Sequence, residues 1–179
     1  MKHKDYSYFL ASESDLLDLS RLMELSTRVL QKPFLNNQQI EASFEAMGLD
    51  KDLVRDQTYF KVLKGATLIG CGGWGKRKTL FGSSSTRNRN EDLLDPLKEP
   101  ARIRAMYTHP KWTRKGVGRF ILELSEEAAS KEGFRKVELM ATLAGEPLYE
   151  RFGYEVVELI EWESSQGVIV PLKRMIKQL

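Results

Sequence analysis

Two glycines and several cations occur together in the stretch TRKGVGRF, Thr113–Phe120, directly before an apolar helical pattern. Glycine is a poor helix former, so its use at a helix start indicates that something must approach the backbone there. The unpaired N–H groups of a helix N-terminus and the neighbouring Arg and Lys side chains favour an anion. Hydrogen bonds to a charged group are worth about 1.5–3 kcal/mol each, so a few can anchor a phosphate. The alternative is a simple turn flanked by solvated charges.

The spacing matches neither of the two common nucleotide-binding patterns. The P-loop sequence G-x-x-x-x-G-K-[ST] is absent, and Ile121 occupies the position of the third glycine in G-x-G-x-x-G. The segment also lies in the middle of the chain, whereas the dinucleotide-binding loop follows the first strand of its domain. An anion bound here is therefore not held in a P-loop or a Rossmann site.

The elements that would position this segment follow from the apolar pattern. A capping box, Ser12 to Asp15, precedes leucines at helical spacing that end at Lys32-Pro33. Alternating runs predict strands over 6–11, 58–63, 67–74, 101–108, 136–141, 154–157 and 167–176, the last interrupted by Pro171. Further helices are expected over 40–47, 117–133 and 147–152. We expect a single α/β domain over 1–179, with a long loop insertion at about 76–100.

Composition and charge exclude several classes of protein. The chain has 41% hydrophobic residues and a net charge of +3, which indicates a globular fold without a concentrated nucleic-acid-binding surface. One cysteine, Cys71, and two histidines argue against a disulfide and a metal site. The N-terminal sequence does not read as a secretory signal, and no apolar run is long enough to span a bilayer. We expect a cytoplasmic protein with no membrane or nucleic-acid partner.

Two longer motifs resemble one known family. The run MYTHPKWTRKGVGRFIL, Met106–Leu122, is similar to the acetyl-CoA-binding segment of the GNAT superfamily of N-acetyltransferases. The run LMATLAGEPLYERFGYEVV, Leu139–Val157, resembles the next strand and helix of that family. The resemblance covers most of the chain, is specific over 101–157 and is weak before Thr58. It implies a GNAT-like mixed, mostly antiparallel sheet flanked by helices, with a splayed strand pair at the cofactor site.

The resemblance also implies which residues bind acetyl-CoA. In this family, the backbone at the end of the strand before the motif pairs with the pantetheine arm, which corresponds here to Met106, Tyr107 and Thr108. The pyrophosphate would lie on the amides of the motif, formed by Arg114, Lys115, Gly116, Val117, Gly118 and Arg119. The first motif position, usually Gln or Arg, is Thr113, with Arg114 one step later. Either Arg114 reaches the pyrophosphate from a different angle, or the amides act without it.

Tyr149 corresponds to the family tyrosine that can protonate the departing CoA thiolate. A phenol with a pKa of about 10 is a suitable acid for that step. The alternative is a core aromatic beside Phe152. The general base is not evident, because Arg102 and Arg104 occupy the strand where this family often has a carboxylate. Candidates for the base are Glu99, Glu146 and an ordered water.

Other chemically active residues have simpler explanations. His109, next to Pro110, is expected to be structural, and Cys71 to be a small buried residue. Trp74 either lines an acceptor pocket or belongs to the core. A run of basic residues is expected to be a solvated loop, with an anion-attracting flap or a contact to the CoA 3′-phosphate as the alternative; it comprises Lys76, Arg77, Lys78, Arg87 and Arg89.

The sequence therefore predicts an N-acetyltransferase that uses acetyl-CoA as co-substrate and no metal. A primary amine of a small molecule or peptide would attack the thioester directly. The alternative is a CoA-binding sensor of the same fold that transfers nothing. The sequence does not identify the amine. We also expect that the end strand Gly167–Ile176 is exposed and offers an edge for a homodimer.

Overall fold

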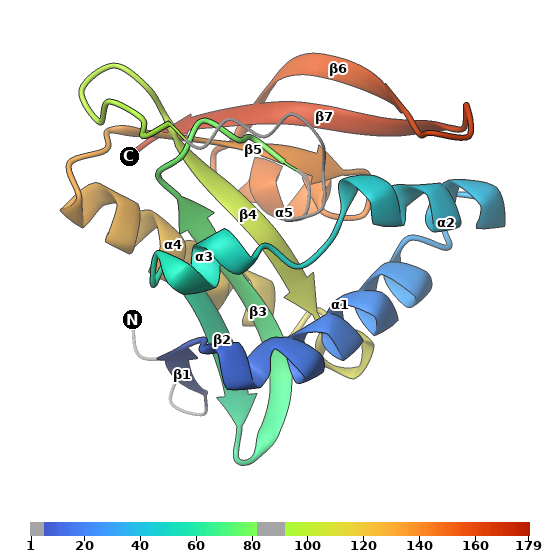
Figure 1. Ribbon diagram of the computed structural model, residues 1–179, viewed down its shortest axis with the longest axis horizontal. Helices are drawn as coiled ribbons and strands as arrows, with labels where there is room; N and C mark the ends of the chain where they lie inside the picture. The colour runs from blue at the N-terminus through green and yellow to red at the C-terminus, as the bar shows by residue number, and fades with distance from the viewer. Residues whose placement is uncertain (1–5, 82–91) are drawn as a thin grey trace.

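The fold is built on one seven-stranded sheet, seen in a computed structural model that describes residues 6–81 and 92–179 (Figure 1). The strand order is β1-β2-β3-β4-β5-β7-β6, and every neighbouring pair is antiparallel except β4 and β5. The strands are β1 (Ser7–Leu10), β2 (Tyr59–Lys64), β3 (Thr67–Gly75), β4 (Ala101–Thr108), β5 (Lys136–Thr142), β6 (Glu155–Glu163) and β7 (Ile169–Gln178). The predicted mixed, mostly antiparallel α/β sheet is confirmed.

Helices cover both faces of the sheet. They are α1 (Leu16–Leu30), α2 (Asn37–Ala46), α3 (Lys51–Arg55), α4 (Val117–Lys131) and α5 (Glu146–Arg151). In Figure 1, α1 and α3 lie in front of β2–β4, and α4 lies behind them. Because side chains alternate along a strand, Tyr59 packs with α1 and α3, whereas Val62 packs against α4. The site described below lies between these two layers.

Glycines in β3 let α4 lie close to the sheet. A Cβ added at Gly70 would be 2.5 Å from Cγ1 of Val117, and one added at Gly72 would be 2.7 Å from Cγ2 of Ile121. Both distances are far below van der Waals contact, so only glycine permits this packing. The first turn of α4, which carries the predicted anion site, is thereby fixed against the middle of the sheet.

The C-terminal strands differ from the sequence prediction. β7 lies between β5 and β6 and pairs with both, so the expectation that Gly167–Ile176 offers a free edge is wrong. The edge strand is β6, which the sequence predicted only over its first residues. Pro171 does not interrupt β7, because pairing with β5 ends at Leu172 and leaves Pro171 facing β6 alone.

Signals that depend on a few neighbouring residues predicted the structure correctly at two places. The capping box forms, with the Ser12 amide donating to Oδ2 of Asp15 over 2.8 Å. The hairpin turn between β2 and β3 contains Gly65 with φ +58°. The short helix α3 was not predicted, since five residues give too little periodicity. Arg87 and Arg89, predicted within the long loop, lie outside the described residues.

Candidate active site

β4 and β5 separate after a short contact. They pair only at Ala101 with Val137 and at Arg102 with Glu138, where the two side chains also form an ion pair. Beyond this point both strands continue, β4 to Thr108 and β5 to Thr142, without pairing to each other. The divergence leaves backbone hydrogen-bonding groups free for a ligand, because a splayed strand cannot satisfy them with its neighbour.

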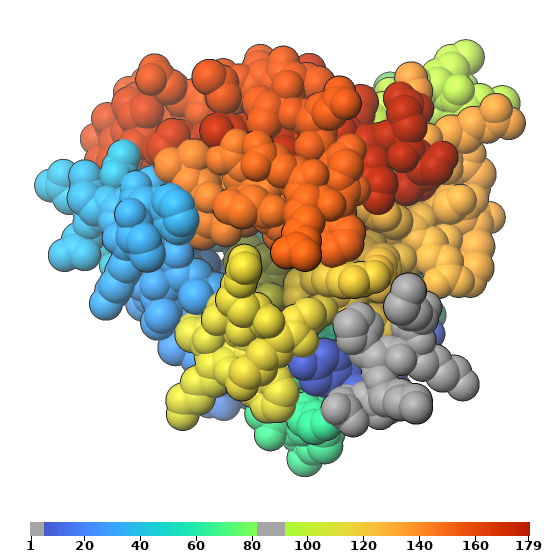
Figure 2. All heavy atoms as spheres, turned by 180° about the vertical axis from the view of Figure 1, so that it is seen from behind, coloured from blue at the N-terminus to red at the C-terminus, as the bar shows by residue number. Residues whose placement is uncertain are grey.

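A cavity of about 530 Å³ lies at the open end of this strand pair. Its walls come from α1, the end of β4, the first turn of α4, the end of β5, and α5. In Figure 2, the yellow segment that follows β4 lies beside the orange segment that includes α5, and residues of both line the cavity. Its volume falls in the range of sites that bind small molecules and cofactors, about 300–1,000 Å³.

The structure brings nearly all of the predicted site residues together here. The wall contains Met106, Tyr107, Thr108, Arg114, Gly116, Val117, Gly118, Arg119 and Tyr149. Lys115 is absent from the described lining; its ammonium lies 4.8 Å from the ring centroid of Trp112, and its carbonyl accepts a hydrogen bond from the Tyr6 hydroxyl. Lys115 therefore stabilises the segment from outside the cavity.

The backbone before α4 forms a concave turn with left-handed residues. Arg114 has φ +61° and Gly116 has φ +84°, both in the left-handed region, and α4 begins directly afterwards at Val117. Left-handed residues alternating with other conformations point successive N–H groups to one side, as in phosphate-binding nests. The first amides of α4 have no acceptor within the helix and carry its positive dipole end. Gly116 and Gly118 thus lie where an anion can approach the backbone.

Thr113 and Arg114, at the start of the motif, lie in different surroundings. The hydroxyl of Thr113 donates to the Pro110 carbonyl over 3.0 Å and closes the turn Pro110–Trp112. Arg114 is exposed at the cavity wall, so its guanidinium is available to an anion there. Arg119 is less available, since its Nε donates to Glu123 and its guanidinium lies 5.4 Å from the Phe152 ring centroid.

A bulge in β4 shapes the cavity floor. Cys71 pairs with Tyr107 and Gly73 with Arg104, so Gly72 alone faces two residues of β4, Ala105 and Met106. Ala105 has φ +51°, and its carbonyl accepts a hydrogen bond from the Tyr59 hydroxyl over 3.0 Å. This buried bond holds the bulge, a feature that re-aims backbone groups next to binding sites.

Cys71 packs against the same tyrosine. Its Sγ lies 3.2 Å from the Tyr59 hydroxyl oxygen, and burial raises the pKa of the thiol to about 12. A thiol with so high a pKa is not a nucleophile at neutral pH. The geometry agrees with the predicted packing role.

Tyr149 lies at the junction of two cavities. It lines the large cavity and a second one of about 90 Å³, whose wall includes Met47, Ile103 and Arg104. Its ring packs edge-on against Tyr154 with 5.7 Å between centroids, and burial raises the pKa of its hydroxyl. Within residues 6–81 and 92–179, no group hydrogen-bonds to that hydroxyl. A protonated phenol facing a cavity can donate to a group that enters it.

The carboxylates considered as bases lie elsewhere. Oε2 of Glu99 accepts from the Asp95 amide near the start of β4, and Glu146 forms an ion pair with Lys173. Among the described residues, the lining of neither cavity includes an Asp or Glu. His109 and Trp74 have structural contacts: Nδ1 of His109 accepts from the Lys111 amide, and Trp74 packs on Phe134 in the core and lines neither cavity.

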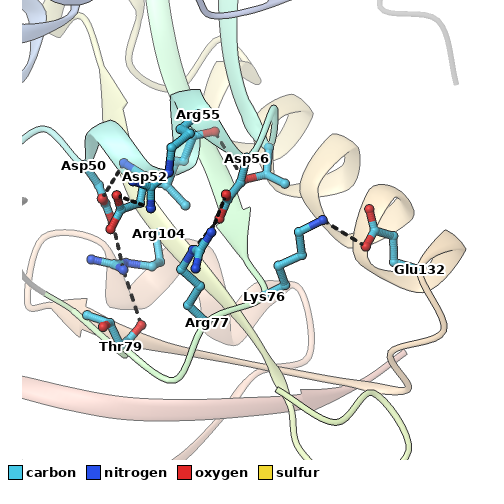
Figure 3. A network of polar contacts seen from close by, with 11 residues as sticks. Asp50, Asp52, Arg55, Asp56, Lys76, Arg77, Thr79, Arg104 and Glu132 are labelled. Atoms are coloured by element: carbon cyan, nitrogen blue, oxygen red, sulfur yellow. Dashed lines mark hydrogen bonds and ion pairs between the residues drawn. The ribbon is translucent and has the colours of Figure 1, made fainter. Parts of the chain in front are cut away.

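A buried ion pair, which the sequence did not reveal, fixes β4 beneath the site. Nη1 of Arg104 lies 2.7 Å from Oδ2 of Asp50, and the two side chains are 5% and 1% exposed (Figure 3). The same guanidinium donates to the Thr79 carbonyl. An aspartate before a short helix reads as an N-cap, which Asp50 also is, so nothing in the sequence pointed to its partner.

Two residues of the basic run, Lys76 and Arg77, are also paired, whereas the Lys78 side chain is exposed. Arg77 donates twice to the Asp56 carboxylate at 2.7 Å, and Lys76 lies 3.4 Å from Glu132, just after α4 (Figure 3). These contacts tie the segment after β3 to α3 and α4. Lys76 and Arg77 thus hold the scaffold together and do not line either cavity.

Removing the charge of Asp50 is expected to destabilise the fold. Asp50→Asn keeps the N-cap oxygen but removes the carboxylate that pairs with the buried Arg104 guanidinium, and breaking a buried ion pair costs about 3–5 kcal/mol. Urea unfolding followed by circular dichroism measures the change. The control is Asp18→Asn, whose partner Arg21 is, like it, 71% exposed, and which should cost at most about 1 kcal/mol. Equal effects of the two changes would contradict a structural role for the buried pair.

The part of the chain that the structure describes holds no cluster of His, Cys, Asp and Glu that fits a metal ion. Across residues 6–81 and 92–179, no helix is both long and apolar enough to cross a membrane.

The parallel strands β4 and β5 diverge, and a backbone nest lies at the start of the helix that follows β4; such a nest can hold an anionic group. The family model for the acetyltransferase (GNAT) domain matches residues 56–156. The chain belongs to this family of acetyltransferases. No curated protein sequence matches it significantly.

Solved structures share the fold over nearly the whole chain at low sequence identity. A GCN5-related N-acetyltransferase from Rhodopseudomonas palustris is 15% identical with a TM-score of 0.72, covering 100% of this chain and 99% of that one. The yncA protein of Salmonella typhimurium, solved with its cofactor acetyl-CoA, is 13% identical with a TM-score of 0.64, covering 98% and 94%. PaiA N-acetyltransferase from Thermoplasma acidophilum, in complex with coenzyme A, is 15% identical with a TM-score of 0.63, covering 97% and 99%.

Proposed function

We propose that the protein binds acetyl-CoA in the large cavity and transfers its acetyl group to a primary amine. The observation that carries the proposal is that one continuous cavity joins the nest at Arg114–Gly118 to Tyr149 through the open end of β4. The pyrophosphate would lie on the nest amides, and the pantetheine arm would pair with the backbone of Met106–Thr108. Solved relatives of this fold with CoA and acetyl-CoA support this choice of ligand.

The residues of the nest fit a pyrophosphate. A Cβ at Gly118 would lie 3.0 Å from Leu148 and 3.7 Å from the Thr108 hydroxyl, so any side chain there would narrow the cavity at its anion end. Arg114 adds a mobile cation beside amides that already point to one side. Donors of this kind stabilise two negative phosphates without a metal ion.

Acetyl-CoA supplies an activated thioester, and the reaction needs one acid and one base. The amine lone pair attacks the carbonyl carbon, the carbon–sulfur bond breaks, and the sulfur leaves with its electron pair. Tyr149 donates its phenolic proton to that sulfur; a phenol with the ordinary pKa of about 10 is already protonated at neutral pH, and burial raises the pKa of Tyr149 further. Since neither lining described above contains a carboxylate, we assign the removal of the amine proton to an ordered water.

The same absence of a lining carboxylate favours one second candidate, a CoA sensor that binds without transfer. The experiment incubates the protein with acetyl-CoA and a panel of primary amines and measures release of the free CoA thiol. Transfer predicts thiol release that depends on both the amine and the enzyme. Micromolar acetyl-CoA binding without any release of CoA thiol would leave only the CoA sensor as a candidate. No binding at all would remove both candidates.

A further inference from the structure

Ala105 is a strained residue of β4, and a buried tyrosine hydroxyl bonds to its carbonyl. Its φ of +51° is a left-handed conformation that residues with a Cβ avoid. The Tyr59 hydroxyl donates to the Ala105 carbonyl over 3.0 Å, and Tyr59 is 0% exposed. A strained conformation persists only where its surroundings hold it, and such residues gather at functional sites. The bond from Tyr59 supplies this hold at the strained residue itself.

Cys71 of β3 fixes the direction in which the Tyr59 hydroxyl donates. Its Sγ lies 3.2 Å from the hydroxyl oxygen. A thiol is a weak acceptor and a backbone carbonyl a strong one, so the single hydroxyl hydrogen goes to Ala105, and the thiol can give its own hydrogen to the hydroxyl oxygen. Burial raises the pKa of Tyr59 well above its ordinary value, so the hydroxyl remains a donor at neutral and moderately alkaline pH.

The bond to Ala105 also orients the next backbone N–H. The peptide bond between Ala105 and Met106 is trans, so the Met106 N–H points opposite to the Ala105 carbonyl and therefore away from Tyr59. In the described sheet, the register gives Met106 no partner in β3, and β5 pairs with β4 only near its start. Met106 lines both cavities, as Tyr149 does. Tyr59 thus fixes the direction of a backbone donor in the part of the wall that contains Tyr149.

We propose that Tyr59 is a positioning residue, whose hydrogen bond to Ala105 holds the Met106 N–H toward the carbonyl oxygen of the bound thioester. That oxygen gains negative charge when the amine attacks the carbonyl carbon and loses it when the carbon–sulfur bond breaks. A donor already fixed in place stabilises the charge without reorganisation. The inference rests on the proposed function for the ligand, acetyl-CoA. The orientation of the peptide by Tyr59 is a property of the fold.

The kinetic test begins with Tyr59→Phe, which keeps the ring and removes only the hydroxyl. We expect kcat to fall at least about tenfold while the acetyl-CoA Kd stays within about threefold, because the donor acts on charge that develops during the reaction. The matched control is Tyr154→Phe. It removes another buried hydroxyl, which donates to Glu126 over 2.9 Å and lies outside both described cavity linings. It should lower the melting temperature and leave kcat unchanged.

A second substitution separates positioning from damage to the fold. Glycine adopts the left-handed conformation without strain, so a glycine at position 105 can keep the bulge without the tyrosine hydroxyl. The double variant Tyr59→Phe/Ala105→Gly should therefore have a kcat at least about threefold above that of Tyr59→Phe. A packing role for Tyr59 predicts no such recovery. If Tyr59→Phe fails to fold, Ala105→Val carries the test: its β-branched side chain opposes the left-handed conformation and should lower kcat with the Kd preserved.

An infrared measurement keeps the test independent of turnover. The carbonyl stretch of acetyl-CoA labelled with ¹³C at the thioester carbon is recorded on the protein without an amine. Because a hydrogen bond to the carbonyl oxygen lowers the frequency, it should rise in Tyr59→Phe, fall again in the double variant and stay unchanged in Tyr154→Phe. This pattern without acetyl transfer to any amine would support the inference and reject only the proposed transfer. The same frequency in the original chain and Tyr59→Phe, equal losses of kcat and affinity, or no recovery in the double variant would overturn the inference.

Discussion

Tyr149→Phe is expected to lower kcat by about a hundredfold or more while changing the acetyl-CoA Kd little, because general acid catalysis contributes about 10²–10⁴ in rate. Phenylalanine keeps the ring that packs on Tyr154 and removes only the hydroxyl, which has no partner among the described residues. Without that proton, the thiolate must leave unprotonated. Steady-state kinetics and calorimetry of the same preparation measure the two quantities separately.

The matched control is Tyr8→Phe, on the exposed strand β1 and outside both described cavity linings. It should leave kcat and Kd unchanged. An equal loss of kcat and of acetyl-CoA affinity in Tyr149→Phe would mean that the residue packs against CoA and does not act as the acid.

The pH dependence of kcat is a second test of the role of Tyr149. Burial raises the pKa of Tyr149 above its ordinary value of about 10, so the acid form persists as pH rises through 9. Activity should therefore increase from pH 6 to 9 as the acceptor amine loses its proton. A fall in kcat that begins below pH 8 and disappears in Tyr149→Phe would contradict the raised pKa.

Gly118→Glu is expected to weaken acetyl-CoA binding by at least about tenfold, since a like charge and a side chain would both oppose the phosphates at the nest. The new side chain would start 3.0 Å from Leu148, inside the cavity that the glycine keeps open. Calorimetric titration with acetyl-CoA measures the loss.

Two other variants show whether the loss of acetyl-CoA affinity comes from the charge of the new side chain, from its size or from its position. Gly118→Ala adds only the Cβ and should have a smaller effect than Glu. Ser130→Glu places the same charge on an exposed position of α4, far along the helix from the nest, and should leave affinity unchanged. Unchanged affinity in Gly118→Glu would exclude this segment as the phosphate site.

Local sequence signals predicted most of the elements and the anion-binding segment. The Ser12–Asp15 capping box, the Gly65 turn and the glycines at 116 and 118 each depend on atoms a few residues apart, so the sequence is enough to find them. The resemblance to a known family supplied Tyr149 and the strand end Met106–Thr108. The structure places these residues in one cavity wall.

The sequence did not predict features that depend on contacts between distant parts of the chain. The expectation of a free edge at Gly167–Ile176 was wrong, because an alternating pattern shows which side of a strand is buried but not which strand lies next to it. Asp50 was missed as the partner of Arg104, since its N-cap role explains it locally.

The sequence by itself thus determined the backbone nest before α4, because a nest is a local structure set by glycines and helix start signals. The tertiary structure decided which helix face closes the cavity and that no described carboxylate lines it. Those properties arise from the divergence of β4 and β5 and the packing of α1 across it, contacts between segments far apart in the chain.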